Sequence, residues 1–313
     1  MNVFYNIEDI EFNKNTCLTV GTFDGVHLGH QKIINEMIYQ SVERSCRNLL
    51  ITFEPHPGLV LAKGNEIKLL STLEQKLDYL KYLSIQNVLV INFTKSFSEL
   101  SFNSFIEDYL IKKIGLNTII VGVDHHFGKD RKGNPKILKE MGENLGFNVI
   151  EVEPLMYKDA KISSSRIRKN LLSGEIKLAN EMLGKKYELK GKVVKGNQRG
   201  KEIGFPTANI ELDNPHKLIP MRGVYFVEVD INNRNFYGMM NIGYRPTFNN
   251  SSELILEVHI FYFREDIYGE SIIIRFIDKL RDEKKFNSVA ELKQQLEIDK
   301  QVCFDKINSI NIY

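Results

Sequence analysis

Gly21-Thr22-Phe23-Asp24-Gly25-Val26-His27-Leu28-Gly29-His30 is the stretch of sequence that decides the fold of the amino-terminal half. It follows an apolar run at residues 17–20, which predicts a buried strand, and it precedes a helical pattern that begins near Gln31. Two glycines permit a tight turn, and His27 and His30 can share one helical face. A strand, a glycine turn and a helix start form a site for anions, because free backbone N–H groups point at the ligand. We therefore predict that the two imidazoles bind the phosphates of a nucleoside triphosphate.

Length and composition describe an ordinary globular protein that is long enough for two domains, with 313 residues and 42% hydrophobic side chains. The 42 basic and 40 acidic side chains nearly balance, which argues against a dedicated nucleic-acid binder. The three cysteines form no CxxC pair, so neither a zinc site nor a disulfide framework is indicated. No signal peptide is evident, and no apolar run approaches the ~20 residues that span a bilayer. We expect a cytoplasmic protein with no membrane and no nucleic-acid partner, and we leave a weak homo-oligomer open.

The first half alternates strand and helix signals, which predicts a doubly wound parallel sheet with ligands at the carboxyl ends of its strands. A helix is expected after Ser71, where Glu74 stands three residues on in a capping-box pattern. The predicted strands are residues 18–20, 49–53, 88–93, 118–123 and 147–152, and the other predicted helices are residues 31–40, 102–114 and 135–145.

After Gly184 the rhythm changes, because strand signals follow one another without intervening helices. This pattern predicts an antiparallel barrel or sandwich, and a helix is expected over residues 289–307. We place the domain boundary near Gly184, which gives domains 1–184 and 185–313. The predicted strands are residues 187–195, 207–212, 224–231, 236–242, 254–263 and 271–276.

Three further segments of the first domain follow predicted strands, so they should gather at the same edge of the sheet. They are Phe-Glu-Pro-His-Pro at residues 53–57, Gly-Val-Asp-His-His-Phe-Gly at 122–128 and Ile-Ser-Ser-Ser-Arg-Ile-Arg at 162–168. The last of them opens a helix, and its hydroxyls with Arg168 one turn in predict a second phosphate cradle. Plainer interpretations stay open: the histidines as a surface pair, and the serines as a simple N-cap run.

The histidine motif and Ile-Ser-Ser-Ser-x-x-Arg resemble the signature of the nucleotidylyltransferase superfamily. With Phe-Glu-Pro-His-Pro, they are similar to the FMN adenylyltransferase module of bacterial bifunctional FAD synthetases. Two positions depart from that pattern: Ser165 stands where the family usually has Thr, and His125 where it commonly has Phe. The resemblance implies a catalytic or phosphate-binding role for His27, His30, Ser163, Ser164 and Arg168, nucleotide contacts for Gly21, Phe23, Asp24 and Gly29, and flavin contacts for Phe53, His56, Pro57, Asp124 and Phe127.

The second domain carries a glycine-rich stretch of its own, Gly-Asn-Gln-Arg-Gly-Lys-Glu-Ile-Gly-Phe-Pro-Thr-Ala-Asn at residues 196–209. Its glycines and basic side chains suit phosphates. Thr207 and Asn209 alternate with Ala208, so in an extended chain both point to one face and can share Mg²⁺ through oxygen ligands. Glu257 lies in an apolar strand and is a candidate base for an attacking hydroxyl, although a solvated outer-face glutamate is the plainer interpretation.

This half resembles riboflavin kinase through Gly-Phe-Pro-Thr-Ala-Asn at 204–209, Gly-Val-Tyr at 223–225, Asn-Ile-Gly-Tyr-Arg-Pro-Thr-Phe at 241–248 and Arg-Asp-Glu-Lys-Lys-Phe at 281–286. The resemblance implies a six-stranded Greek-key barrel in which Thr207 and Asn209 hold Mg²⁺-ATP and Glu257 is the base. It also implies nucleotide contacts for Gly196 and Lys201 and a flavin contact for Arg281. Lys201 stands where the family often has Arg, which keeps the charge but loses the bidentate fork.

The two resemblances together predict a bifunctional enzyme of FAD biosynthesis with ATP, riboflavin and FMN as substrates and Mg²⁺ in both steps. The barrel would phosphorylate riboflavin to FMN, and the α/β domain would transfer AMP from a second ATP to FMN. Two rivals stay open: a nucleotidyltransferase with one activity, of the cytidylyl or pantetheine-phosphate type, and a flavin-binding protein without catalysis.

Overall fold

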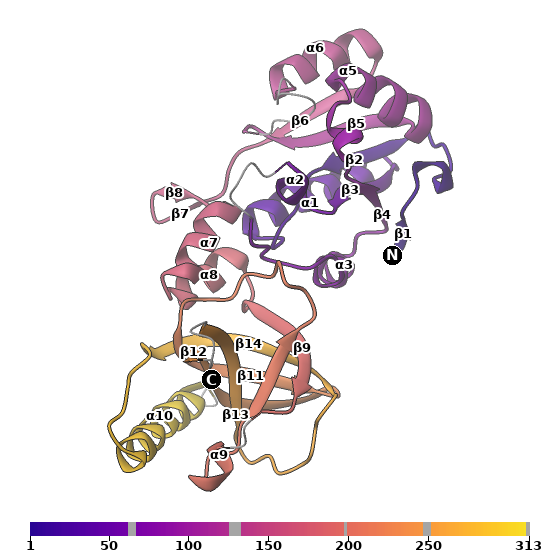
Figure 1. Cartoon of the computed structure of the whole chain (residues 1–313). Helices are drawn as coiled ribbons and strands as arrows, with labels where there is room; N and C mark the ends of the chain where they lie inside the picture. Colours follow the sequence, from indigo (N-terminus) through magenta and orange to yellow (C-terminus); the bar gives the residue numbers. More distant parts are fainter. Residues whose placement is uncertain (62–66, 125–132, 197–198, 247–251, 311–313) are drawn as a thin grey trace. The chain divides into compact units, whose positions relative to one another are not determined.

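The computed structural model describes residues 1–61, 67–124, 133–196, 199–246 and 252–310 (Figure 1). The chain divides into two compact units, Met1–Ser164 and Ser165–Tyr313. Helices α7 (Ser164–Leu172) and α8 (Ile176–Leu183) thus group with the second unit, whereas the sequence placed the boundary after them, near Gly184. That assignment of the domains stays a prediction. Among the described residues, none of the helices combines the length and apolar character needed to cross a bilayer.

The first unit is built on a six-stranded sheet with the order β1-β4-β3-β2-β5-β6, in which every pair is parallel. The parallel sheet confirms the prediction. Its edge strand β1 was not expected, because three residues are too few to show a period. The strands are β1 (Asn2–Phe4), β2 (Thr16–Val20), β3 (Arg47–Glu54), β4 (Asn87–Asn92), β5 (Leu116–Gly122) and β6 (Asn148–Val152).

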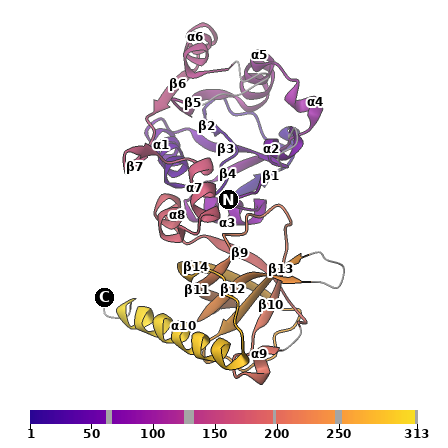
Figure 2. The ribbon, with the colours of Figure 1, turned by 60° about the vertical axis from the view of Figure 1, so that its left-hand side comes forward.

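Helices cover both faces of this sheet, so the strands read as apolar runs rather than alternating patterns. One face packs against α1 and α3 and the other against α5, η2 and α6 (Figure 2). The main helices are α1 (Leu28–Glu43), α3 (Leu73–Tyr82), α5 (Phe102–Ser104) running into the π-helical η2 (Phe105–Ile114), and α6 (Pro135–Leu145). The short elements are η1 (Ile7–Asp9), α2 (Pro57–Val60), α4 (Lys95–Ser98), β7 (Met156–Tyr157) and β8 (Ala160–Lys161).

The start of α3 differs from the sequence prediction by one residue. The N-cap is Thr72, and the capping box pairs it with Gln75, not Ser71 with Glu74. Ser71 is engaged elsewhere: its backbone N–H donates to Asp24 Oδ1 at 3.0 Å, and its Oγ accepts from the N–H of Gly25 at 2.9 Å. The Ser71 hydroxyl, which the local sequence pattern assigned to the helix cap, is therefore bonded to Gly25 of the histidine loop instead.

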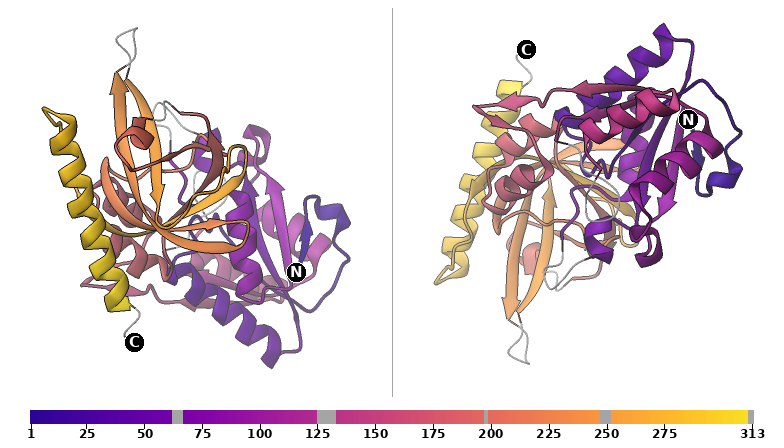
Figure 3. Two further views of the ribbon diagram at one scale, coloured as in Figure 1. Left: turned by 90° about the horizontal axis from the view of Figure 1, so that it is seen from below. Right: turned by 90° about the horizontal axis from the view of Figure 1, so that it is seen from above.

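The second unit contains a closed antiparallel barrel with the order β10-β13-β12-β11-β14-β9, which confirms the predicted six strands. Figure 3 shows the C-terminal helix α10 lying alongside the barrel. The bounds are β9 (Glu188–Val194), β10 (Ala208–Leu212), β11 (Gly223–Ile231), β12 (Arg234–Pro246), β13 (Ser252–Ile260), β14 (Ser271–Arg281), α9 (Arg199–Glu202) and α10 (Val289–Ile310).

The outer wall of the barrel is partly apolar, because α10 packs there. Phe226, Met239 and Phe261 point outward into a cluster with Cys303 of α10. At the end of β14, the guanidinium of Arg281 grips the buried carboxylate of Asp299 on α10, with Nε–Oδ2 at 2.9 Å. One face of the wall is thus closed by the helix.

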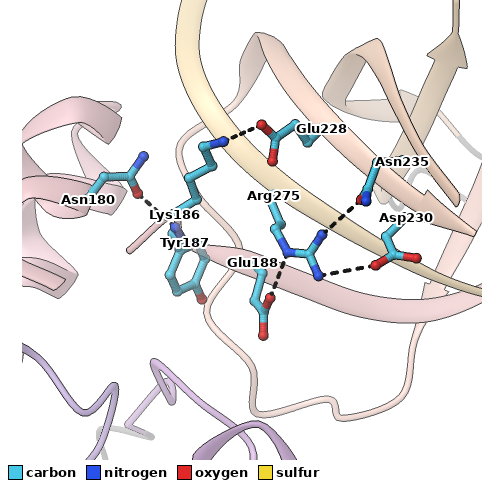
Figure 4. Close-up of polar contacts among 8 residues, drawn as sticks. All are labelled: Asn180, Lys186, Tyr187, Glu188, Glu228, Asp230, Asn235 and Arg275. Carbon is cyan, nitrogen blue, oxygen red and sulfur yellow. Dashed lines mark hydrogen bonds and ion pairs between the residues drawn. The ribbon is translucent and has the colours of Figure 1, made fainter. Parts of the chain in front are cut away.

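Another part of the wall carries a polar network (Figure 4). Arg275 of β14 reaches Asp230 on β11 at 3.3 Å and Glu188 on β9 at 3.5 Å. Asn180 of α8 donates to the carbonyl oxygen of Phe276 at 2.9 Å and accepts from the N–H of Tyr187 at 2.7 Å. These two hydrogen bonds fasten α8 to the barrel, which is why the helix groups with the second unit.

Candidate active sites

The histidine motif forms a strained loop at the carboxyl end of β2, a central and fully buried strand. Phe23 and Val26 take left-handed backbone angles, with φ of 46° and 43°, and both side chains are buried. Non-glycine residues rarely adopt this conformation, and they persist in it only when surrounding contacts impose it. The loop is therefore held by its neighbours in a shape that the sequence alone does not prefer.

The two imidazoles lie face to face at the N-terminus of α1. His27 is the N-cap, and its Nδ1 accepts a hydrogen bond from the backbone N–H of His30 at 3.2 Å. The two rings stack with centroids 3.6 Å apart, and Phe23 packs its edge against His30 at 5.3 Å. Because Nδ1 of His27 is an acceptor, the neutral ring carries its proton on Nε2 and can donate it to an anion. Sequence spacing predicted this pair, and the structure brings it together where the helix dipole favours negative charge.

Asp24 of the same loop faces into the protein. Its carboxylate is 2% exposed and accepts hydrogen bonds from the backbone N–H groups of Leu70 and Ser71, each at 3.0 Å. The side chain therefore fastens the loop to the segment before α3. The nucleotide contact predicted for Asp24 stays a prediction.

The second phosphate cradle begins beside the histidine loop. Ser164 opens α7, and its Oγ donates to the carbonyl oxygen of Asp24 at 3.1 Å. A Cβ atom added to Gly29 would stand 3.6 Å from the carbonyl oxygen of Ile162 and 3.2 Å from the His27 ring. The absence of a side chain at Gly29 thus leaves room for the His27 ring, and the segment before Ser163 lies within contact distance of α1. Arg168 lies one turn further along α7, in the second unit.

The residues predicted to contact flavin in the first unit are spread over three segments. Phe53, at the end of β3, stacks edge-on against Phe93 at 5.6 Å. His56 caps α2, where Pro57 is the first residue, and its Nδ1 accepts from the N–H of Gly58 at 2.9 Å. Asp124 is exposed and pairs with Lys161 at 2.7 Å. Phe127 and the unusual His125 lie outside the described residues.

In the barrel, three polar residues from three strands form one row. Asn209 on β10 and Asn241 on β12 both lie directly opposite Glu257 on the intervening β13. Directly paired residues project from the same face with Cβ atoms about 4.5–5.5 Å apart, so both amides flank the carboxylate. Leu256 and Val258 are buried inside the barrel, which places this row on the outer wall.

Asn241 was missed by the sequence analysis, although the signal was present. Residue 241 opens the Asn-Ile-Gly-Tyr-Arg-Pro-Thr-Phe segment that carries the resemblance, and the strand register places it opposite Glu257. Beside Asn241, Gly243 makes room for Glu283, whose Oε1 would lie 2.6 Å from a Cβ at that glycine. The polar row therefore continues toward residues 281–283, which belong to a segment that carries the resemblance to riboflavin kinase.

Glycine is required at the start of the nucleotide loop. A Cβ at Gly196 would stand 2.0 Å from Nδ2 of Asn209, and a Cβ at Gly200 would stand 2.2 Å from the carbonyl oxygen of Phe205. At Gly200 the backbone excludes a side chain, and at Gly196 a side chain would have to displace the amide of Asn209. The backbone at Gly196 thus lies directly over the side chain of Asn209, while the side chain of Lys201 lies outside the described residues.

Thr207 and Asn209 offer a hydroxyl and an amide oxygen from alternate positions of one chain segment. Thr207 is exposed and Asn209 is half-buried. Oxygen donors of this kind fit Mg²⁺ with a nucleotide supplying the remaining ligands. In the described part of the chain, no three acidic, His or Cys side chains gather into a metal-binding group. The other predicted residue, Arg281, is bound to Asp299, and its flavin contact stays a prediction.

His259 lies two positions after Glu257 and shares its outward direction. Its Nδ1 is 2.8 Å from the carbonyl oxygen of Pro206, the residue before Thr207. Burial lowers the pKa of this imidazole, and the hydrogen bond to Pro206 partly opposes that shift. The imidazole of His259 therefore lies beside the site and fixes the position of the Pro206–Thr207 segment through this hydrogen bond.

Comparison with known proteins assigns one family to each half. The family described as FAD synthetase matches residues 9–166, and the family described as riboflavin kinase matches residues 183–306. The bifunctional riboflavin kinase/FMN adenylyltransferase of Buchnera aphidicola (subspecies Schizaphis graminum) is 40% identical over 98% of each chain.

Two further similar proteins cover nearly all of the chain. The bifunctional riboflavin kinase/FMN adenylyltransferase of Bacillus subtilis is 39% identical over 93% of this chain and 92% of its own. A crystal structure from Streptococcus pneumoniae, titled as a macrolide-efflux protein, superimposes with a TM-score of 0.87 at 32% identity, covering 96% of this chain and 98% of the other.

Proposed function

The chain belongs to the family of bifunctional riboflavin kinase/FMN adenylyltransferases, and from that membership we propose how its residues divide the work. It phosphorylates riboflavin to FMN with ATP and adenylylates FMN to FAD. We assign adenylyl transfer to the histidine loop of the first unit and phosphorylation to the polar row of the barrel. The observation that carries the assignment is the stacked imidazole pair at the N-terminus of α1.

In adenylyl transfer, a phosphate oxygen of FMN attacks the α-phosphorus of ATP, and the bond to pyrophosphate breaks. Negative charge grows on the phosphoryl oxygens in the transition state. His27 and His30 lie where α1 presents its free N–H groups, so donors and dipole act on the same anion. The hydroxyls of Ser163 and Ser164 would support the same phosphates, and the resemblance assigns a phosphate-binding role to Arg168 as well. The protein contributes positioning and charge, and no covalent intermediate is needed.

In the kinase reaction, the terminal hydroxyl of the ribityl chain attacks the γ-phosphorus of ATP and ADP leaves. Glu257 accepts the proton of that hydroxyl, and Asn209 beside it orients the nucleotide. Thr207 and Asn209 would hold Mg²⁺, which when bound neutralises charge on the ATP phosphates. Gly196 keeps the loop backbone close to Asn209.

The test is a product assay on the whole chain with riboflavin, ATP and Mg²⁺. We expect FMN to appear first and FAD to follow, and FMN supplied directly should give FAD without the first step. A parallel assay with EDTA should stop both steps, which tests the metal. Appearance of neither product would refute the proposal.

Two controls separate the rivals. Turnover of CTP or phosphopantetheine in place of ATP and FMN would favour a nucleotidyltransferase of another type. Flavin binding in calorimetry without any turnover would favour a binding protein.

The proposal also keeps the cytoplasm as the location and leaves a weak homo-oligomer open. Cys17 and Cys303 are free thiols, and burial raises the pKa of each to about 12, so both stay protonated and unreactive. Such thiols suit a reducing compartment. Fractionation of the source cells and light scattering of the purified protein test the two points.

A further inference from the structure

A lysine is buried behind the histidine loop. Lys76, in the second turn of α3, is 4% exposed, and its Nζ donates to Oγ1 of Thr52 at 3.1 Å. Thr52 is fully buried near the end of β3, and its hydroxyl donates a hydrogen bond to the carbonyl oxygen of Thr22 at 3.2 Å. Lysines are almost never this buried unless they are paired. The ammonium group is thus one hydroxyl away from the backbone of the histidine motif.

Two carboxylates balance this cation. Burial lowers the pKa of Lys76, while the charges of Asp24 and Glu54 raise it. Asp24 is 2% exposed and belongs to the histidine loop, whereas Glu54 ends β3. A buried anion and a buried cation need one another, because each alone would be uncompensated in a medium of low dielectric. The negative charge of Asp24, in the histidine loop, thus favours the protonated form of Lys76 on α3.

Backbone hydrogen bonds give a second connection between the histidine loop and the start of α3. The carboxylate of Asp24 accepts from the N–H groups of Leu70 and Ser71, the two residues before the N-cap of α3. Ser71 in turn accepts from the N–H of Gly25 at 2.9 Å. The loop is thus tied to α3 on both sides of Asp24.

The loop needs such support, because Phe23 and Val26 sit in left-handed conformations on either side of Asp24 and Gly25. Phe23 also sets the tilt of the His30 ring, against which its edge packs at 5.3 Å. If the loop relaxed, Phe23 would move and the imidazole pair would lose its stacking.

We propose that Lys76 is a positioning residue of the adenylyl-transfer site, which holds His27 and His30 in place through Thr52, Thr22 and Asp24. The proposal rests on the function assigned above to the histidine loop. Lys76 does not touch the reacting atoms. It acts by holding a strained loop and by compensating the buried charge of Asp24.

The first test compares Lys76→Met with Lys81→Met, a matched control at an exposed position of the same helix. Lys76→Met keeps an unbranched, flexible side chain but removes the terminal ammonium group and its charge. We expect kcat for FAD formation from FMN to fall about 30- to 100-fold, because misplaced groups lose transition-state contacts. KM for ATP should change less than threefold, and riboflavin phosphorylation by the same sample should stay within twofold of wild type. Lys81→Met should match wild type in both reactions. A Lys76→Met chain whose FAD formation stays within threefold of wild type would overturn the proposal.

The second test keeps the lysine and removes the Thr52 hydroxyl, which accepts from Lys76 and donates to Thr22. Thr52→Val preserves shape, and we expect the imidazole resonances of His27 and His30 to shift in its NMR spectrum while FAD formation falls about threefold to tenfold. The resonances are assigned with His27→Gln and His30→Gln chains. Unmoved imidazole resonances in Thr52→Val would contradict the proposal even if Lys76→Met failed to fold.

A double variant tests the electrostatic interaction between Asp24 and Lys76. Asp24→Asn with Lys76→Met should lose less activity than the product of the two single losses, because neither charge is then left alone. If the loss in the double variant equals the product of the two single losses, the two side chains do not interact, and that result would contradict this part of the proposal. Absence of FAD formation in the wild-type chain would refute the proposed function instead, and the imidazole shifts in Thr52→Val would still decide the role of Lys76.

Discussion

The two candidate sites are assembled in opposite ways. The histidine site draws its central groups from one run of ten residues, and the chain folds that run into a strained loop and a helix start. The barrel site takes Asn209, Asn241 and Glu257 from three strands, and only the register of the barrel brings them into one row. The first site depends on local conformation supported from behind, and the second depends on strand pairing.

This difference determines how each site should fail. A change in the histidine loop should disturb one reaction and leave the barrel register untouched. A change in the barrel row should act through the residues directly opposite it on the neighbouring strands. Because both reactions belong to one chain, each serves as the folding control for the other.

The largest effect is expected for His30→Ala. The substitution removes a donor and the ring that stacks on His27, so FAD formation from FMN should fall on the order of 10³-fold. FMN formation from riboflavin should stay within twofold. Both rates are measured on one preparation by chromatography of the flavins. Loss of both activities in a folded chain would argue against two separate sites.

Asn209→Ala should give the mirror image. The amide lies beside Glu257 and under the loop at Gly196, so its loss should lower FMN formation roughly 10²- to 10³-fold. FAD formation from supplied FMN should be unchanged. The two single variants mixed in one tube should restore conversion of riboflavin to FAD, since each supplies the step that the other lacks.

Gly196→Ala should weaken the kinase without removing any polar group. The added methyl would lie 2.0 Å from Nδ2 of Asn209, so the amide must turn away. We expect FMN formation to fall about 10²-fold, because a displacement near 1 Å can cost that much. Gly196→Ala with Asn209→Ala should be no slower than Asn209→Ala alone. A further loss in the double variant would show that the glycine acts in another way.

The sequence predicted the histidine site better than the barrel site, for a physical reason. His27, His30 and the α1 start lie in one contiguous stretch, where spacing and helical geometry suffice. The sequence did not reveal that Asp24 faces inward, since that depends on Leu70 and Ser71 folding beside it. Lys76 was missed for the same reason, because in sequence it is an ordinary helix lysine.

In the barrel, the sequence predicted six strands and the outward direction of Glu257, since alternation alone indicates which side faces the core. It did not pick out Asn241, because cross-strand pairing must be known to one residue before two positions can be called neighbours. It also assigned Ser71 to the cap of α3, although Thr72 occupies that place. Local patterns thus predicted elements well and long-range partners poorly.

Asn241→Ala tests the residue that the register revealed. Its amide flanks Glu257 on the side opposite Asn209, so its loss should leave the base less well oriented. We expect kcat for FMN formation to fall about tenfold, with KM for ATP changed less than twofold. Asn235→Ala, near the start of the same strand and bonded to Arg275 rather than paired with Glu257, is the matched control and should leave FMN formation unchanged. If both variants lose FMN formation equally, the place of Asn241 beside Glu257 does not matter for the kinase reaction.

The smallest effect is expected from His259, whose burial lowers its pKa below the usual value near 6.5. Between the lowered pKa and 6.5, the unfolded chain binds a proton that the folded chain does not. The free energy of unfolding should therefore fall as the pH drops through this window and be unaffected above it. Lys300 and Glu297 of α10 also face the ring, with Lys300 lowering the pKa and Glu297 raising it. Urea unfolding of wild type and His259→Asn at pH 8 and pH 5.5 measures the difference. The acid loss should be smaller in His259→Asn, and the same loss in both chains would mean that this imidazole is not what makes the barrel wall sensitive to acid.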